Sequence, residues 1–158
     1  MVKRTSFEKA ECPVARSLDA LGDWWSLLII RDALLGKRRF GEFQKSLGVA
    51  KNILTTRLHA LVDDGILTTV PASDGSAYQE YLLTPKGRGV FPVLIALRQW
   101  SEEFSFRSEP CTMLLVDREN GRPVQKLELR AQDGRLLGAG DTEVRANPSR
   151  KRQPRISA

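Results

Sequence analysis

The chain has 158 residues, of which 41% are hydrophobic, and it carries a formal net charge of +6. These values favour one domain with an appendage, and they predict that most of the chain is globular rather than disordered. No apolar run approaches the roughly 20 residues that span a bilayer, and the first residues lack the apolar stretch of a signal peptide. We therefore expect a cytoplasmic protein that does not enter a membrane.

The positive charge gathers near the C-terminus. Five basic residues lie in a tail that has no acid after Glu143, and without them the net charge falls from +6 to +1. They are Arg145, Arg150, Lys151, Arg152 and Arg155. An argument for nucleic-acid binding must therefore rest on local pattern rather than on overall charge.

Neither cysteine indicates a metal site. Cys12 and Cys111 are far apart in the sequence, no CxxC motif is present, and the chain has one histidine. A structural zinc site takes four such ligands. We therefore expect two free thiols, no bound metal and no other cofactor.

Two helices are predicted first. CPVARSLDALG favours a short helix that begins near Pro13 and is broken by Gly22. WWSLLIIRDALL follows, with Asp23 suited to cap it and Gly36 to end it. Because apolar residues cover most of its circumference, this second helix is predicted to be a central core helix.

A helix pair with unlike surfaces comes next. KRRFGEFQKSLG predicts a short helix closed by Gly48, and NILTTRLHALVDDGIL predicts an amphipathic helix from about Asn52. The inward stripe of the amphipathic helix consists of Leu54, Leu58, Leu61 and Val62. Its outward side carries Asn52, Ile53, Thr55, Thr56 and His59. His59 is open to two interpretations, a base contact or a partly buried core histidine.

A hairpin and a long helix follow Gly65. ILTTV and YQEYLL predict two strands around the turn sequence PASDGSA, which gives a hairpin from Ile66 to Leu83. Thr84 and Pro85 predict the cap and first residue of a long helix. Its apolar residues occupy more than one face: Val90, Phe91, Val93, Leu94, Ile95, Leu97, Trp100 and Phe104. Such a helix needs two packing surfaces, its own domain and a second copy of the chain.

The last third changes character. TMLLVD, RPVQKLELR and RLLGAG predict three short strands joined by turns at Asn120-Gly121 and Asp133-Gly134. Few large apolar residues follow Asp141. We therefore expect a winged-helix domain over residues 1–107, a small β-meander over 108–140, and a basic, disordered tail over 141–158.

The order of elements predicts an α+β, mainly helical fold, the winged helix-turn-helix. In that fold the amphipathic helix enters the major groove, and its N-terminal residues touch base edges. Candidate base contacts are Asn52, Ile53, Thr55, Thr56 and His59. Candidate phosphate contacts are Lys37, Arg38, Arg39, Lys51 and Arg57. The acids Asp63 and Asp64 are expected at the far end of this helix, away from DNA.

These stretches together resemble the HxlR-type transcriptional regulators, a winged-helix family related to the MarR type. The resemblance runs from Cys12 to Phe104, with a domain over about 12–107. Its motifs are CPV, LGDWWSLLIIRDALLG, RFGEF, LTTRLHALVDDGIL, EYLLTPKG and FPVLIALRQW. It implies a homodimer that binds double-stranded operator DNA and represses or activates nearby genes. It also implies that the helix from Pro85 and the N-terminal helix build the dimer.

Three features bear on how far the resemblance extends: a helix cap, the charge of the hairpin and a cysteine. Ala50 stands where the family often has a capping serine, and the hairpin carries Asp74 and Glu80 but no basic residue. The acids argue against a minor-groove contact by the wing. Cys12 matches a cysteine that senses oxidants or electrophiles in some members, and a helix N-terminus lowers a thiol pKa. A small-molecule or oxidant effector is thus implied, and the alternative is that Cys12 is a small buried residue.

Two other functions are alternatives to DNA binding. The acidic hairpin would suit a protein-interaction module on a winged-helix scaffold without specific DNA binding. A thiol enzyme could use Cys12 and His59, but the sequence supplies neither an orienting third group nor an oxyanion site. We therefore expect no enzymatic activity.

Overall fold

A computed structural model of the chain describes residues 6–104 and 113–147. The chain divides into two units, Met1–Pro110 and Cys111–Ala158. Within the described ranges, none of the helices is long and apolar enough to cross a membrane.

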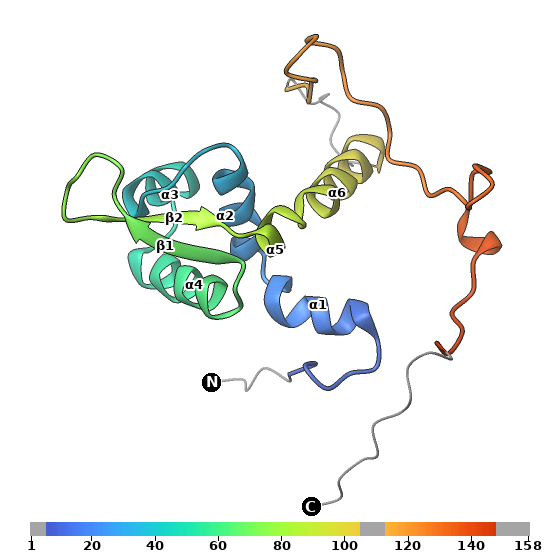
Figure 1. The fold of residues 1–158 in the computed structure, drawn as a ribbon, viewed down its shortest axis with the longest axis horizontal. Helices are drawn as coiled ribbons and strands as arrows, with labels where there is room; N and C mark the ends of the chain where they lie inside the picture. Colours follow the sequence, from blue (N-terminus) through green and yellow to red (C-terminus); the bar gives the residue numbers. More distant parts are fainter. Residues whose placement is uncertain (1–5, 105–112, 148–158) are drawn as a thin grey trace, which may run out of the picture. The chain divides into compact units, whose positions relative to one another are not determined.

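The first unit is a mixed α+β, mainly helical winged helix-turn-helix, as predicted (Figure 1). Each predicted element is present, with one helix divided in two. The elements are α1 (Pro13–Leu21), α2 (Trp24–Leu34), α3 (Phe40–Leu47), α4 (Lys51–Asp63), β1 (Leu67–Pro71), β2 (Gln79–Leu83), α5 (Pro85–Arg88) and α6 (Phe91–Phe104).

Local chemistry sets the helix boundaries that the sequence predicted. The Asp23 carboxylate accepts a hydrogen bond from the Ser26 N–H at 3.0 Å and so caps α2. Gly36 and Gly48 follow α2 and α3 with φ values of 95° and 62°, a left-handed conformation that glycine adopts at no steric cost. These caps fix where the chain turns between α2, α3 and α4.

The core of the first unit lies where α2, α3, α4 and the hairpin meet. Its fully buried members are Ile29, Ile30, Phe43, Leu54, Leu58, Leu61, Ile66 and Leu67. Leu54, Leu58 and Leu61 are the predicted inner stripe of α4, and partly buried Val62 packs against the same core. The predicted orientation of α4 is therefore confirmed.

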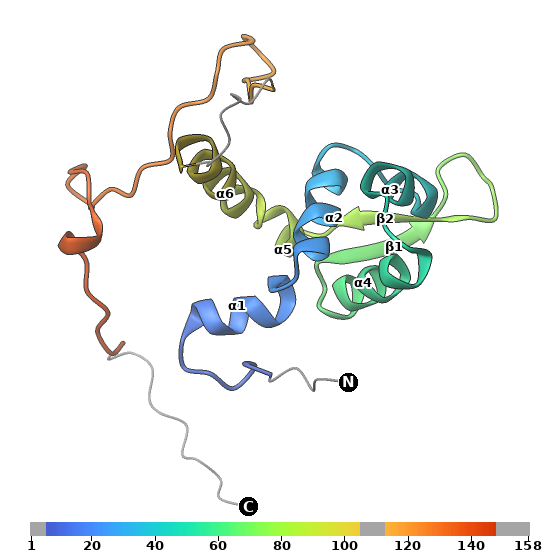
Figure 2. The same cartoon turned by 180° about the vertical axis from the view of Figure 1, so that it is seen from behind.

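The wing is the antiparallel pair of β1 and β2, with Leu67 opposite Leu83 and Pro71 opposite Gln79. Both views show its turn projecting beyond α3 and α4 (Figures 1 and 2). The Thr84 hydroxyl donates to the Gly65 carbonyl at 2.7 Å and accepts the Gly87 N–H at 3.1 Å. This threonine therefore closes the base of the wing and caps α5 at once.

The long helix predicted from Pro85 is wrong in one respect, because it is broken between Arg88 and Phe91. The cause is Pro92. It has no N–H to donate to the Arg88 carbonyl, and its ring would clash with that carbonyl in a continuous helix. A proline is tolerated in the first turn of a helix, which is where Pro92 lies in α6.

The second unit does not form the predicted three-stranded meander in its described residues. It has two isolated bridges, Val116 with Pro123 and Arg130 with Leu136, and a 3-10 helix, η1 (Ala139–Asp141). Pro123 lacks an N–H, so it cannot donate a hydrogen bond that would extend its pairing with Val116 into a longer strand pair. The tail predicted to be disordered is 141–158, and most of it, residues 148–158, lies outside the described residues. Cys111 lies outside them as well.

Candidate nucleic-acid interface

The outer face of α4 is an exposed surface that faces away from the core. All five candidate base contacts are exposed, and Lys51 is exposed beside them. They are Asn52, Ile53, Thr55, Thr56 and His59. The core interpretation of His59 is therefore wrong. Ile53 keeps 37% of its surface in solvent, so an apolar group interrupts an otherwise polar face.

The two threonines use their hydroxyl protons within the helix. Thr55 Oγ1 donates to the Lys51 carbonyl at 2.8 Å, and Thr56 Oγ1 donates to the Asn52 carbonyl at 2.9 Å. A hydroxyl that donates in this way still offers acceptor lone pairs. Each threonine thus presents an acceptor and a methyl group, which suit the amino groups of adenine or cytosine and the thymine methyl.

The N-terminus of α4 is open. Ala50 is its N-cap and makes no side-chain cap, so the first N–H groups of the helix are available to an anion such as a phosphate. Lys51 stands at this end, with no ion-pair partner among the described residues. Asp63 lies roughly 18 Å away at the other end, given 1.5 Å per residue. The charge along α4 therefore favours an anion at the Lys51 end.

Two other predicted phosphate contacts are paired with acids, one within α2 and one at its N-cap. Lys37 Nζ lies 3.6 Å from the Asp32 carboxylate, which is 1% exposed. Arg57 Nε lies 3.3 Å from Asp23 Oδ1, so α4 is tied to the cap of α2. Lys37 and Arg57 therefore form ion pairs within the protein and are only partly available to a phosphate.

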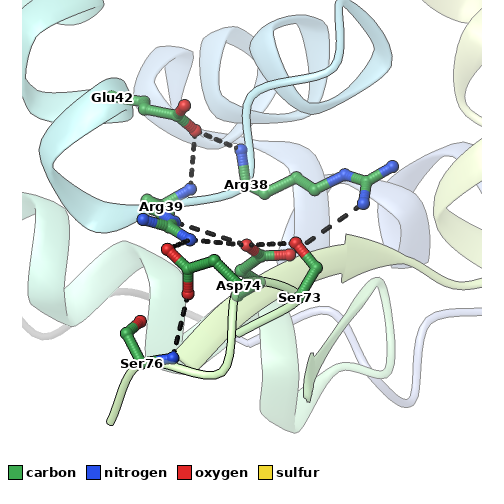
Figure 3. Close-up of polar contacts among 7 residues, drawn as sticks. Arg38, Arg39, Glu42, Ser73, Asp74 and Ser76 are labelled. Carbon is green, nitrogen blue, oxygen red and sulfur yellow. Dashed lines mark hydrogen bonds and ion pairs between the residues drawn. The ribbon is translucent and has the colours of Figure 1, made fainter. Parts of the chain in front are cut away.

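Arg38 and Arg39 meet the acids of the wing (Figure 3). Arg39 Nη2 lies 2.6 Å from Asp74 Oδ2 and 3.2 Å from Glu80 Oε1. Arg38 Nη1 lies 3.9 Å from the second Glu80 oxygen. Glu80 is only 4% exposed, and Ser73 donates a hydrogen bond to it. The wing acids are therefore ion-paired rather than presented as free negative charges.

Hydrogen bonds keep this cluster ionised. Ser76 and Arg39 donate to the Asp74 carboxylate and hold its pKa well below its usual range. Burial raises the pKa of Glu80, but hydrogen bonds from Ser73 and Arg39 outweigh it and the net pKa is lowered. The pKa of Arg39 is raised by its bonds to both acids. At neutral pH the cluster is thus a fully charged tie between wing and α3.

The backbone that carries Arg38 and Arg39 is fixed by Glu42. Its carboxylate accepts the N–H groups of Arg38 and Arg39 at 2.7 and 2.9 Å. These two bonds lower the pKa of Glu42. The Arg38 carbonyl accepts the Tyr81 N–H of β2 at 2.7 Å. The loop before α3 is therefore held both to its own helix and to the wing.

Sequence reasoning missed the inward roles of Asp32 and Glu80. Asp32 lies on the apolar helix α2, where an acid next to Arg31 gives a weak signal of a buried ion pair. Glu80 is about forty residues from its arginine partners. No local spacing could have indicated that pair.

Cys12 is exposed and is the N-cap of α1, without a side-chain cap bond. The interpretation of Cys12 as a small buried residue is therefore wrong. No cluster of three or more histidine, cysteine, aspartate or glutamate side chains suited to a metal occurs in the described part of the chain.

Comparison with protein-family models identifies a family for this chain. The sequence model of the HxlR-like helix-turn-helix matches residues 20–109. An uncharacterized HTH-type transcriptional regulator of Mycobacterium bovis, Mb3122, is 41% identical over 96 residues. That alignment covers 61% of this chain and 61% of the relative, so the chain spans about three-fifths of the length of that relative.

Solved structures extend the likeness. The crystal structure of PA1607, a candidate transcription factor, is 55% identical with a TM-score of 0.86, and the match covers 90% of this chain and all of that one. The redox regulator HypR in its reduced form is 30% identical with a TM-score of 0.53, covering 58% of this chain and 92% of HypR.

Proposed function

The chain belongs to the HxlR-like helix-turn-helix family of transcriptional regulators, and from this premise we propose that it binds operator DNA as a homodimer and represses or activates nearby genes. The observation that carries the proposal is the surface of α4. Its inner stripe is buried, its outer face is exposed, and its N-terminus is open beside Lys51. A helix of this kind fits the major groove.

The proposed contacts divide by type. Asn52, Ile53, Thr55, Thr56 and His59 would meet base edges, and Lys51 with the first N–H groups of α4 would meet phosphates. Lys37, Arg38, Arg39 and Arg57 are proposed as phosphate contacts as well. Because each of them has an acidic partner in the fold, a phosphate would have to exchange with a carboxylate.

Apolar side chains on α6 support the homodimer. Five of them are 45–61% exposed: Phe91, Val93, Leu97, Trp100 and Phe104. Val14 of α1 is 68% exposed. A monomer rarely leaves such a run of large apolar groups in water, and a second copy would cover it.

Selection of bound fragments from a pool of DNA from the source genome tests the proposal. We expect enrichment of discrete sites and an affinity that falls with salt, because phosphate contacts release counterions. A dimer that enriches no fragment would contradict the proposal and favour the protein-interaction module. The acidic hairpin was the reason to consider a protein-interaction module. Because Asp74 and Glu80 are paired with arginines, the hairpin gives that alternative less support.

Replacing Asp74 by asparagine should strengthen DNA binding. The change removes an acid from the wing and releases Arg39 from its closest carboxylate. We expect affinity for any DNA to rise several-fold and the salt dependence to steepen by about one counterion, as for one added phosphate contact. Fluorescence anisotropy over a range of salt concentrations measures both.

Asp63→Asn is the matched control, because it makes the same charge change at the exposed far end of α4. It should change neither quantity appreciably. Weaker binding by Asp74→Asn would show instead that Arg39 acts by anchoring the wing.

A response to oxidants or electrophiles through Cys12 is also proposed. The thiol is exposed at the start of α1, and the neighbour HypR is named a redox regulator. Mass spectrometry after treatment with a limiting electrophile should find Cys12 modified, and DNA affinity should change with modification. Cys12→Ser should abolish that change. Modification that leaves DNA binding untouched would rule out a sensing role.

A further inference from the structure

A hollow lies between α3 and the start of β2. Its volume is about 530 Å³, and it is lined almost entirely by apolar atoms. The helix contributes Phe40, Gly41 and Lys45, and the wing contributes Tyr78 and Gln79. This volume falls in the range of small-molecule sites in proteins. The contacts proposed between α4 and DNA do not use this hollow.

Gly41 leaves the helix side of the hollow open. A Cβ at residue 41 would meet nothing within 4 Å, so no neighbouring side chain covers the helix backbone there. Lys45 follows Gly41 by about one helical turn and therefore lies on the same face of α3. The stem of a lysine can lie along apolar surface while its ammonium group reaches water. This side of the hollow is thus apolar, with a cation at one end.

Two aromatic rings line the hollow. Tyr78 is 69% exposed, although its backbone is held in place because its carbonyl accepts the Ala72 N–H at 2.9 Å. Phe40 is half-buried and packs against the core, so its position is fixed as well. Aromatic rings attract a third ring through stacked or edge-on contacts, beyond the ordinary gain from apolar burial. The lining therefore suits a planar aromatic ligand.

The charges around the hollow select an anion. Arg39 is paired with two acids of the wing, and Glu42 accepts the N–H groups of the loop before α3. Lys45 is exposed and has no ion-pair partner in the part of the chain that the structure describes. Its ammonium group is thus available to a ligand, and a carboxylate matches it. A bare phosphate would gain nothing from the apolar walls, whereas an aromatic carboxylate would use both the walls and the cation.

We propose that this hollow binds a small planar aromatic carboxylate and is an effector site of the regulator. The effector role rests on the proposed binding to operator DNA, whereas the binding site itself does not. Arg39 lines the hollow and also ties the wing to α3, so a bound ligand lies against the contact that positions the wing. The ligand also brings a negative charge next to the basic loop before α3. Its binding should therefore weaken the binding of DNA.

Titration of the full-length protein with 2-naphthoate, followed by NMR of the backbone amides, tests the site. We expect saturation with a dissociation constant of about 1 mM or lower. The shifted amides should gather at residues 40–45 and 78–79. The neutral 2-naphthamide should bind roughly threefold or more weakly, because it lacks the charge that pairs with Lys45.

Lys45→Gln separates the charge from the apolar lining. It should remove the preference for 2-naphthoate and leave the affinity for 2-naphthamide unchanged. Absence of saturation by 2-naphthoate, or equal affinities for the acid and the amide in the unsubstituted protein, would overturn the proposal.

A substitution pair on α3 tests the place of binding. Gly41→Leu puts a side chain into the hollow and should abolish binding of 2-naphthoate. Folding should survive, because leucine favours a helix and its Cβ has no close neighbour. Ser46→Leu makes a similar change on an exposed residue outside the lining, roughly 140° around the helix, and should leave the affinity unchanged. Equal effects of the two changes would overturn the proposal.

Operator affinity with and without saturating 2-naphthoate tests the effector role. We expect the affinity to fall about threefold or more in the unsubstituted protein and to stay constant in Gly41→Leu. Ligand binding without a change in operator affinity would overturn the effector role. If the protein selected no DNA, the proposed function and the effector role would both fail, while the titration would still decide whether the hollow binds an aromatic acid.

Discussion

Asn52→Ala combined with Thr56→Ala is expected to lower affinity for the specific operator roughly a hundredfold or more while leaving weak, sequence-independent binding intact. Contacts with base edges each discriminate by about 1–3 kcal/mol, and phosphate contacts do not depend on these two side chains. Both residues are exposed on α4, and alanine favours a helix, so folding should survive. Competition between operator and random duplex DNA measures the loss.

Lys51→Ala is the informative control for this double change. It removes a charge at the same helix end, so it should weaken binding to all sequences alike and reduce the salt slope by about one. Sequence preference should remain. If the double variant kept its operator preference, α4 would not be the reading helix and the assignment of its outer face would be wrong.

The orientation of α4 is the part of the site that the sequence predicts well. Leu54, Leu58 and Leu61 recur at helical spacing, and burial follows from that period alone. Helix ends at Gly36 and Gly48 were likewise predictable, because glycine is the residue that enters the left-handed region cheaply. Local rules therefore suffice wherever a single residue or a single period decides the structure.

The electrostatics of the site were not predictable in the same way. Arg39 follows Lys37 and Arg38 in the sequence, and this basic run predicts a phosphate contact, but folding brings Arg39 to Asp74 and Glu80 of the wing. A pair that joins residues about forty positions apart depends on the tertiary arrangement of α3 and the hairpin. The same limit applies to Lys37 and buried Asp32, whose pairing needs α2 and the following loop in place.

In residues 113–147 the turns were predicted correctly, but the strands were not. The turn residues predicted hairpins correctly at Asn120-Gly121 and Asp133-Gly134, where both glycines have positive φ. Turn chemistry does not supply the packing surface that a sheet needs. Strand extent therefore could not be judged from residues 113–147 alone.

Gly87→Ala is expected to destabilise the first unit by about 3 kcal/mol, because the added methyl group has no space. A Cβ at residue 87 would lie 2.2 Å from the Ile66 carbonyl oxygen and 2.8 Å from Leu83 Cδ2. The Ile66 oxygen is a backbone atom held by the Thr84 N–H at 3.1 Å and cannot yield as a flexible side chain would. Urea unfolding followed by tryptophan fluorescence measures the loss.

Gly41→Ala is the control that separates the effect of the close contact at residue 87 from the general effect of replacing a glycine by alanine. Gly41 lies in α3, where a Cβ would meet nothing within 4 Å, so alanine should stabilise by roughly 0.5–1 kcal/mol through helix propensity.

The Gly87 contact joins α5 to the base of the wing, between Ile66 and Thr84. Strain there should therefore also weaken operator binding, even under conditions where the Gly87→Ala protein remains folded. Equal stability changes in the two variants would show that α5 can move away from Ile66, and the wing base would then not depend on this contact.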